Sequence, residues 1–168
     1  TNYEDSKTEE LLSENGPTES MGKRNLTFGK ELWIEREDFM EVPAKKWFRL
    51  APGSMVRLKS AYIVKCESFT KDESGNILEV HCTYIPESKS GSDSSGINVK
   101  GTIHWVSAAN AAFAEARLYD RLFTNENPLA VEGDFKDTIN PNSLQIIAKA
   151  VIEPSLKQVN FDNRYQFI

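Results

Sequence analysis

The chain has little of what metal binding and covalent catalysis require. Among its 168 residues there are only two cysteines, without a CxxC pair, and only two histidines, so we expect no structural zinc site. The motifs GxSxG, GxxxxGK(S/T), GxGxxG and HExxH, which carry nucleophiles, phosphate loops and metal ligands in many enzymes, are absent. We therefore expect no catalytic residue and no metal ligand in this chain.

Long apolar runs are missing as well. No stretch reaches the roughly 18 consecutive apolar residues of a membrane-spanning helix, and the first residues lack the basic start and apolar core of an export signal. These absences predict a cytoplasmic protein with no membrane partner. Cys66 and Cys82 are then expected to be reduced core residues on neighbouring strands.

An excess of basic residues, which nucleic-acid-binding domains usually have, is missing from the chain as a whole, because the net charge is −5. The acidic excess is local, however. Residues 1–20 hold six of the 25 acidic residues and one of the 20 basic ones, which leaves 19 of each in the remainder. The net charge therefore does not exclude an anionic partner.

Residues 42–66, which we call the basic segment, contain no acidic residue and three interleaved aromatic residues, Trp47, Phe48 and Tyr62. Its cations are Lys45, Lys46, Arg49, Arg57, Lys59 and Lys65. Single-stranded RNA binding uses cations for phosphates and flat rings for base stacking. A solvated strand face above core aromatics would have the same composition, so composition alone leaves both interpretations open.

Alternation of apolar and polar residues predicts several short strands. Residues 4–20 are acidic and lack any such period, so we expect a mobile connector there, with ordered structure from about Leu26. A turn at residues 71–76 joins two of the strands into a long hairpin, and the Ser- and Gly-rich residues 88–96 are expected to form a flexible loop. The predicted strands are residues 32–34, 56–66, 78–84 and 99–106.

The last third of the chain is harder to assign. Residues 108–123 combine alanines of high helical propensity with strand-forming residues, so the pattern leaves helix and strand open. A turn is predicted at residues 139–142, a β-rich segment at 144–152 and a helical turn at 154–156. Short strands separated by turns are typical of a barrel or a sandwich.

The stretch KGTIHWVSA at residues 100–108 resembles the anticodon-binding region of glutaminyl-tRNA synthetases, and the likeness covers roughly residues 21–168. The motifs that carry it elsewhere are RLYDRLF at 117–123, INPNSL at 139–144, EPSL at 153–156, LWIE at 32–35 and VRL at 56–58. The resemblance implies an all-β fold of two tandem antiparallel β-barrels with short helical turns, and it favours a strand at residues 114–123. It implies a connector with the start of the proximal barrel at residues 1–24, a mainly distal barrel at 25–106 and a mainly proximal barrel at 107–168.

The same resemblance implies that the chain is a fragment that grips the anticodon loop of tRNA(Gln). The parent enzyme, a glutamine-tRNA ligase, would attach glutamine to its tRNA with ATP and magnesium in a catalytic domain upstream in the same chain. No cofactor would belong to the fragment itself, and the protein would be a monomer. The hypothesis from another class is a free-standing β-barrel that binds RNA or a protein without catalysis, which fold alone does not exclude.

The resemblance also implies which residues contact the anticodon: Arg49, Arg57 and Gln166. Arg49 would read the guanine at the third position, because a guanidinium fits the O6 and N7 edge of guanine. Arg57 would donate to a carbonyl shared by the two wobble pyrimidines, and Gln166 would pair with the middle uracil. The residues implied to make backbone or secondary contacts are Lys46, Lys59 and Ser60. For the two arginines, the alternative interpretation is an exposed salt bridge.

Overall fold

The computed structural model describes residues 1–158, and within them it contains strands and short 3-10 helices but no α-helix. The expected all-β class is therefore confirmed. Contacts divide the chain into two units: residues 1–111 with the residues from 153 onward, called the main unit, and residues 112–152, called the arm. No helix among the described residues is long and apolar enough to cross a membrane.

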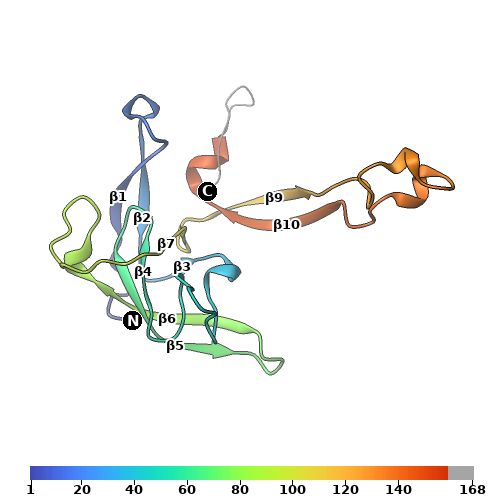
Figure 1. Ribbon diagram of the computed structural model, residues 1–168. Helices are drawn as coiled ribbons and strands as arrows, with labels where there is room; N and C mark the ends of the chain where they lie inside the picture. Colours follow the sequence, from blue (N-terminus) through green and yellow to red (C-terminus); the bar gives the residue numbers. More distant parts are fainter. Residues whose placement is uncertain (159–168) are drawn as a thin grey trace. The chain divides into compact units, whose positions relative to one another are not determined.

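The main unit is organised around a four-stranded sheet with the order β6-β5-β4-β7. Its strands are β4 (Met55–Leu58), β5 (Ile63–Lys71), β6 (Ile77–Ile85) and β7 (Thr102–Ile103). β5 and β6 form the predicted long hairpin, and β7 lies parallel to β4 at the other edge (Figure 1). Cys66 and Cys82 face each other across this hairpin as free thiols, as expected of neighbours in the register.

The prediction of one strand over residues 56–66 is wrong, because the chain turns between β4 and β5. The Leu58 amide donates to the carbonyl of Tyr62 at 2.9 Å, and Ser60 has a φ of 60°. In the resulting hairpin Val56 pairs with Val64, so even-numbered residues face even-numbered ones and the alternation continues unbroken through the turn. A regular alternation could therefore not reveal that the strand is two strands.

The prediction of a connector without packed structure at residues 4–20 is also wrong. β1 (Glu9–Glu14) and β2 (Lys23–Phe28) form an antiparallel hairpin, joined through the 3-10 helix η1 (Glu19–Met21). Leu11 and Ser13 are buried at alternate positions of β1. Because one of the two buried residues is a serine, the apolar period of this strand is too weak to recognise.

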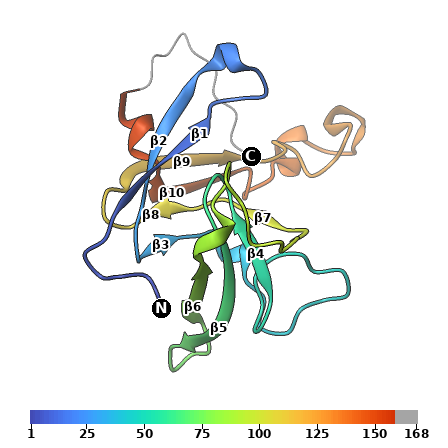
Figure 2. The same cartoon turned by 90° about the vertical axis from the view of Figure 1, so that its left-hand side faces the viewer.

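A third small sheet pairs β3 (Leu32–Trp33) with β8 (Val106–Ser107), as Figure 2 shows. β3 confirms the strand predicted at residues 32–34. The strand predicted at residues 99–106 is instead two short pieces, β7 and β8, because the chain leaves one sheet for another between them. Three further 3-10 helices connect or follow these strands: η2 (Arg36–Asp38), η3 (Pro86–Ser88) and η6 (Pro154–Gln158), the last at the predicted helical turn.

The core of the main unit is rich in aromatic side chains. The centroid of the Phe28 ring lies 5.1 to 5.4 Å from those of Tyr3, Tyr62 and Trp105. The contacts with Tyr3 and Trp105 are edge-to-face, an arrangement that adds to the free energy of simple burial. Each fully buried aliphatic side chain around them stabilises the fold by about 1.5 to 3 kcal/mol. The largest of these are Leu50, Ile63 and Val56.

The arm is a two-stranded antiparallel ribbon of β9 (Ala112–Tyr119) and β10 (Leu144–Ile152), with a register shift between Ile147 and Ala150. β9 decides the open question at residues 108–123 in favour of a strand, and β10 confirms the segment predicted at 144–152. Two 3-10 helices lie between the strands, η4 (Pro128–Ala130) and η5 (Phe135–Thr138).

The described residues form four separate sheets, and none of the four closes into a barrel. One pair of strands, β4 and β7, is parallel, which departs from the expected antiparallel pairing. The class predicted from the resemblance is thus confirmed at the level of an all-β chain with several sheets. The division into a distal and a proximal barrel at residue 107 stays a prediction.

Candidate nucleic-acid interface

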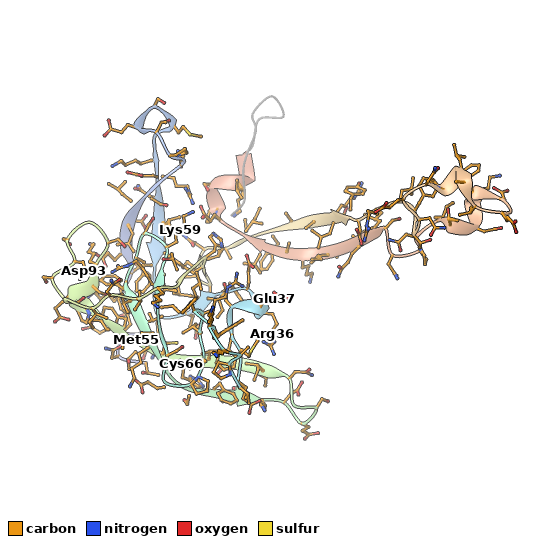
Figure 3. All side chains as sticks on the ribbon, viewed as in Figure 1. Arg36, Glu37, Met55, Lys59, Cys66 and Asp93 are labelled. Atoms are coloured by element: carbon orange, nitrogen blue, oxygen red, sulfur yellow. The ribbon has the colours of Figure 1, made fainter. Side chains whose placement is uncertain are left out.

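Five of the six residues predicted to contact RNA lie in the part of the chain that the structure describes, and Gln166 lies outside it. All five belong to the basic segment, on the loop before β4, on β4 itself and on the turn after it. Figure 3 labels Lys59 at that turn and Asp93 in the loop that follows η3. Within residues 1–158, no group of three or more His, Cys, Asp or Glu side chains is arranged to hold a metal ion.

The loop that carries Lys46 and Arg49 is closed at its base by backbone hydrogen bonds. The Leu50 amide donates to the carbonyl of Asp38 at 2.9 Å, and the Met40 amide donates to the carbonyl of Leu50 at 3.0 Å. Inside the loop, the Trp47 indole nitrogen donates to the Leu50 carbonyl at 2.9 Å. The half-buried Trp47 side chain therefore stabilises this loop.

The backbone of residue 101 also supports this loop. A Cβ on Gly101 would lie 1.6 Å from the carbonyl oxygen of Phe48, so only glycine permits this close approach. The Gly101 carbonyl accepts a hydrogen bond from the Arg57 amide at 2.9 Å. The Arg49 loop and β4 are thus held against the same short segment.

Arg49 makes one contact with an acidic residue. Its Nη1 atom lies 3.1 Å from Oδ1 of Asp38, whose side chain is 6% exposed, whereas half of the Arg49 side chain remains exposed. Burial raises the pKa of Asp38 above its usual value, and the positive charge of Arg49 offsets only part of that rise. The guanidinium is thus held by one contact with a buried carboxylate, while half of the side chain stays exposed.

Arg57 is held much more completely. Its Nη1 donates to the carbonyl of Ser88 at 2.7 Å and to Oγ of Ser90 at 3.3 Å, and its Nη2 donates to Oδ2 of Asp93 at 2.5 Å. Only 22% of its side chain is exposed. Arg57 is therefore half-buried, with its guanidinium bonded to residues of the segment 88–93, and its salt bridge is not the exposed one of the alternative interpretation.

Residues 88–96, expected to be a flexible loop, are irregular but anchored at their start. The Ser88 hydroxyl accepts from the Ile63 amide and donates to the Ile85 carbonyl, both at 2.7 Å, and it is fully buried. The amide and the hydroxyl of Ser90 both donate to the carbonyl of Ala61, at 2.9 and 2.8 Å. The loop therefore presents fixed oxygen atoms to Arg57.

Lys59 and Ser60 occupy the tight turn between β4 and β5. The Lys59 amide donates to Ile103, and its carbonyl accepts from the Trp105 indole at 2.9 Å. The Ser60 hydroxyl lies 3.0 Å from that of Ser13. The backbone of Lys59 and the hydroxyl of Ser60 thus have structural partners, while the Lys59 ammonium has no acidic partner within 4.0 Å among the described residues.

A second cluster joins three distant segments of the main unit. The Arg24 guanidinium holds both carboxylate oxygens of Glu153, from Nε at 2.5 Å and from Nη2 at 2.8 Å, and Nε2 of His104 lies 3.2 Å from Oε1. Burial alone would raise the pKa of Glu153, but the hydrogen bonds and charges of Arg24 and His104 lower it to about 2. This cluster fixes η6 to β2, where the chain re-enters the main unit.

Sequence reasoning missed the acidic partners of both arginines. Asp38 lies just before the basic segment and Asp93 in a predicted flexible loop, and neither stands in a recognisable motif with its arginine. Asp93 is 36 residues from Arg57. The available signal is the complete lack of acids within the basic segment, which requires that its cations find counterions elsewhere or remain free for a ligand.

Comparisons with known proteins also indicate an RNA-binding region. Two family models, both described as tRNA synthetases class I (E and Q), anti-codon binding domain, match residues 1–85 and residues 102–168. The chain is 53% identical to a glutamine–tRNA ligase of Clostridium perfringens over 167 residues, which make up 99% of the chain and 30% of that protein. Glutamine–tRNA ligases of Clostridium kluyveri and Cupriavidus necator are 47% and 48% identical over 99% of the chain.

The chain spans 28% to 30% of the length of these three relatives. Both family models carry the same description, and together they include the Asp38–Arg49 pair, β4 and the cluster around Glu153. With this coverage and identity, the chain belongs to the family of anticodon-binding domains of class I tRNA synthetases for glutamate and glutamine.

Proposed function

We propose that this chain reads the anticodon of tRNA(Gln) for a parent glutamine–tRNA ligase, and that Arg49 recognises the guanine at the third position. The observation that carries the proposal is the Arg49 guanidinium itself, which is aimed by a buried carboxylate and half exposed within a segment that has no acid of its own. A guanidinium held on one side and open on the other can donate two hydrogen bonds to the O6 and N7 atoms of guanine.

The remaining anticodon contacts follow from the donors and acceptors of each side chain. Arg57 donates to a carbonyl oxygen that cytosine and uracil share, so it accepts either wobble pyrimidine. Gln166, outside the described residues, offers an acceptor and a donor that suit the middle uracil. Lys46 and Lys59 contact phosphates, and Ser60 is a secondary contact near the turn.

The parent enzyme supplies the chemistry that this chain lacks. Its catalytic domain, upstream in the same chain, binds ATP with magnesium and joins glutamine to the tRNA. The present residues bind and orient the anticodon, and no step of the ligation passes through them. We further propose that the parent is a cytoplasmic monomer and that the sheets of this region belong to two consecutive barrels.

The test is aminoacylation by the full-length parent with tRNA transcripts that carry guanine or adenine at the third anticodon position. Arg49→Ala is expected to lower kcat/KM for the guanine transcript about ten- to a hundredfold and to reduce the discrimination between the two transcripts. Lys46→Ala, the matched loss of one cation from the same loop, should weaken both transcripts about equally, because a phosphate contact carries no sequence information. An equal loss on both transcripts for Arg49→Ala would refute base reading by this residue.

A further inference from the structure

Arg57 differs from three lysines of the basic segment in that an acidic side chain neutralises it, as Asp38 does for Arg49 and Glu67 for Lys65. No acidic group lies within 4.0 Å of Lys45, Lys46 or Lys59 among residues 1–158, and these three can be expected to act as free charges. Arg57 instead forms a short ion pair with Asp93, and both side chains are less than one-third exposed. The pair carries no net charge, so it offers little attraction to a phosphate.

The ion pair still leaves donors available for a ligand. A guanidinium has five N–H groups, and three contacts involve the carbonyl of Ser88, the hydroxyl of Ser90 and the carboxylate of Asp93. Two N–H groups have no acceptor among the described residues. A neutral donor pair of this kind suits a neutral oxygen on a base edge better than an anionic phosphate.

Asp93 is itself held in position. Its Oδ1 atom accepts from the amide and the hydroxyl of Ser95, at 2.8 and 2.7 Å, while Oδ2 accepts from Arg57. Hydrogen bonds from Ser95 and the pairing with Arg57 also lower the pKa of Asp93, so the carboxylate is ionised at neutral pH. All three partners of the guanidinium, the Ser88 carbonyl, the Ser90 hydroxyl and the Asp93 carboxylate, are therefore fixed in the absence of RNA.

We propose that Asp93 is a specificity-determining residue: it neutralises and orients Arg57, so that Arg57 selects a pyrimidine base instead of gripping a phosphate. The inference rests on the proposed reading of the wobble base by Arg57. The Asp93 carboxylate lowers the general affinity for RNA and raises the selectivity for a pyrimidine, because without it Arg57 would carry an unpaired positive charge. A merely structural aspartate would lower binding of every RNA when removed, whereas this one should raise binding of the wrong RNA.

The test uses the 168-residue chain and four RNA stem-loops with cytosine, uracil, adenine or guanine at the first anticodon position, titrated over a series of salt concentrations. Asp93→Asn is expected to reduce the preference for pyrimidines about tenfold, mainly by tighter binding of the purine loops at low salt. The slope of log affinity against log salt should become steeper by about 0.7, one additional phosphate contact to single-stranded RNA.

The control variant is Glu73→Gln, which removes one negative charge from the exposed turn between β5 and β6. It should leave the pyrimidine preference and the salt slope unchanged. Asp93→Glu, which restores the charge, should restore the salt slope, and thermal unfolding of all three variants verifies that they fold.

The outcomes separate the inference from the function on which it rests. If the unaltered chain prefers pyrimidines and Asp93→Asn retains that preference and the salt slope, the role of Asp93 is refuted while base reading stands. Uniformly weaker binding of all four loops by Asp93→Asn would likewise refute the inference, because it would show that Asp93 has only a structural role. If the unaltered chain binds all four loops equally, the wobble reading by Arg57 fails, and the role of Asp93 with it.

Discussion

Two carboxylates of the main unit are almost equally buried, yet their pKa values shift in opposite directions. Asp38 is 4% exposed and Glu153 is 7% exposed. Burial raises the pKa of Asp38 because a single contact from a half-exposed Arg49 does not compensate for lost hydration. At Glu153, two nitrogen atoms of Arg24 and one of His104 outweigh the same effect of burial.

This difference separates an arginine whose donors are mostly bonded within the protein from one whose donors are mostly unbonded. Arg24 also donates from Nη1 to the Glu14 carbonyl at 3.0 Å, so its hydrogen-bonding capacity is largely used within the protein. Arg49 has one acidic contact and an exposed guanidinium, so most of its N–H groups remain available. An incompletely compensated pair costs some stability and leaves N–H donors without a protein acceptor, which suits the proposed reading of guanine by Arg49.

Among the variants that test this comparison of the two carboxylates, the largest change in unfolding free energy is expected at Glu153. Glu153→Gln should cost about 3 kcal/mol of unfolding free energy at pH 7, because it leaves the half-buried Arg24 without its counterion. The pKa of Glu153 is lowered from 4.5 to about 2, so its stabilisation is complete above pH 4.5 and is lost as the pH falls toward 2. Urea unfolding of the original protein and of Glu153→Gln between pH 7 and pH 2 measures the difference in unfolding free energy and its loss at low pH.

Glu14→Gln is the matched control for that experiment, since its partner Lys23 lies 3.8 Å away and both side chains are more than half exposed. It should change stability by less than about 0.5 kcal/mol. A cost for Glu153→Gln no larger than that of Glu14→Gln would remove the distinction between the two carboxylates.

A smaller effect is expected from Arg49→Ala, and its pH dependence should have the opposite sign. At pH 7 the variant leaves a buried, ionised Asp38 without its counterion, at a cost of about 1 to 2 kcal/mol. Because the pKa of Asp38 is raised, its ionised form destabilises the fold, and stability is regained as the pH falls through that raised pKa. The deficit of the variant should therefore shrink as the pH falls and the Asp38 carboxylate becomes protonated.

Urea unfolding of the Arg49→Ala variant over a series of pH values from 7 downward provides the measurement. Lys46→Ala, which removes an exposed cation of the same loop, should change stability by less than about 0.5 kcal/mol throughout the series. If the deficit of Arg49→Ala were the same at every pH in the series, the cause would be lost packing and not the charge of Asp38.

A feature could be predicted from the sequence where it depends on neighbouring residues, and could not where it depends on distant ones. The β5–β6 hairpin and the facing positions of Cys66 and Cys82 follow from a two-residue period and a turn of six residues, which are local features. The strand β9 could be assigned only through the resemblance, because its alanines suit a helix equally well. β1 could not be recognised because the buried side chain at residue 13 is a serine, paired with a hydroxyl of a turn 47 residues away.

The sequence predicts the cations of the candidate site but not the acidic residues that pair with them. The absence of acids from residues 42–66 is a local property of the sequence and makes its six cations candidates for binding an anionic partner, but only the resemblance selects Arg49 and Arg57 among them. Their acidic partners are brought in by a backbone bridge at Asp38 and by a loop anchored through Ser88. Such partners depend on tertiary contacts, which leave no period or motif in the sequence.

The smallest effect is expected from Asp38→Asn, and it is the most direct test of how Asp38 and Arg49 interact. An asparagine keeps the shape of the side chain and removes a buried charge that has only one counterion, so the unfolding free energy at pH 7 should stay within about 0.5 kcal/mol of the original value or rise slightly. In the double variant Asp38→Asn/Arg49→Ala, the pH-dependent part of the Arg49→Ala deficit should vanish, since no carboxylate is left to be stranded. Urea unfolding of the four proteins over the same series of pH values completes the cycle. A loss of more than about 2 kcal/mol for Asp38→Asn alone, roughly the cost of breaking a well-made buried pair, would show that Asp38 and Arg49 stabilise the fold as Glu153 and Arg24 do, and that Arg49 is not held in reserve for the anticodon.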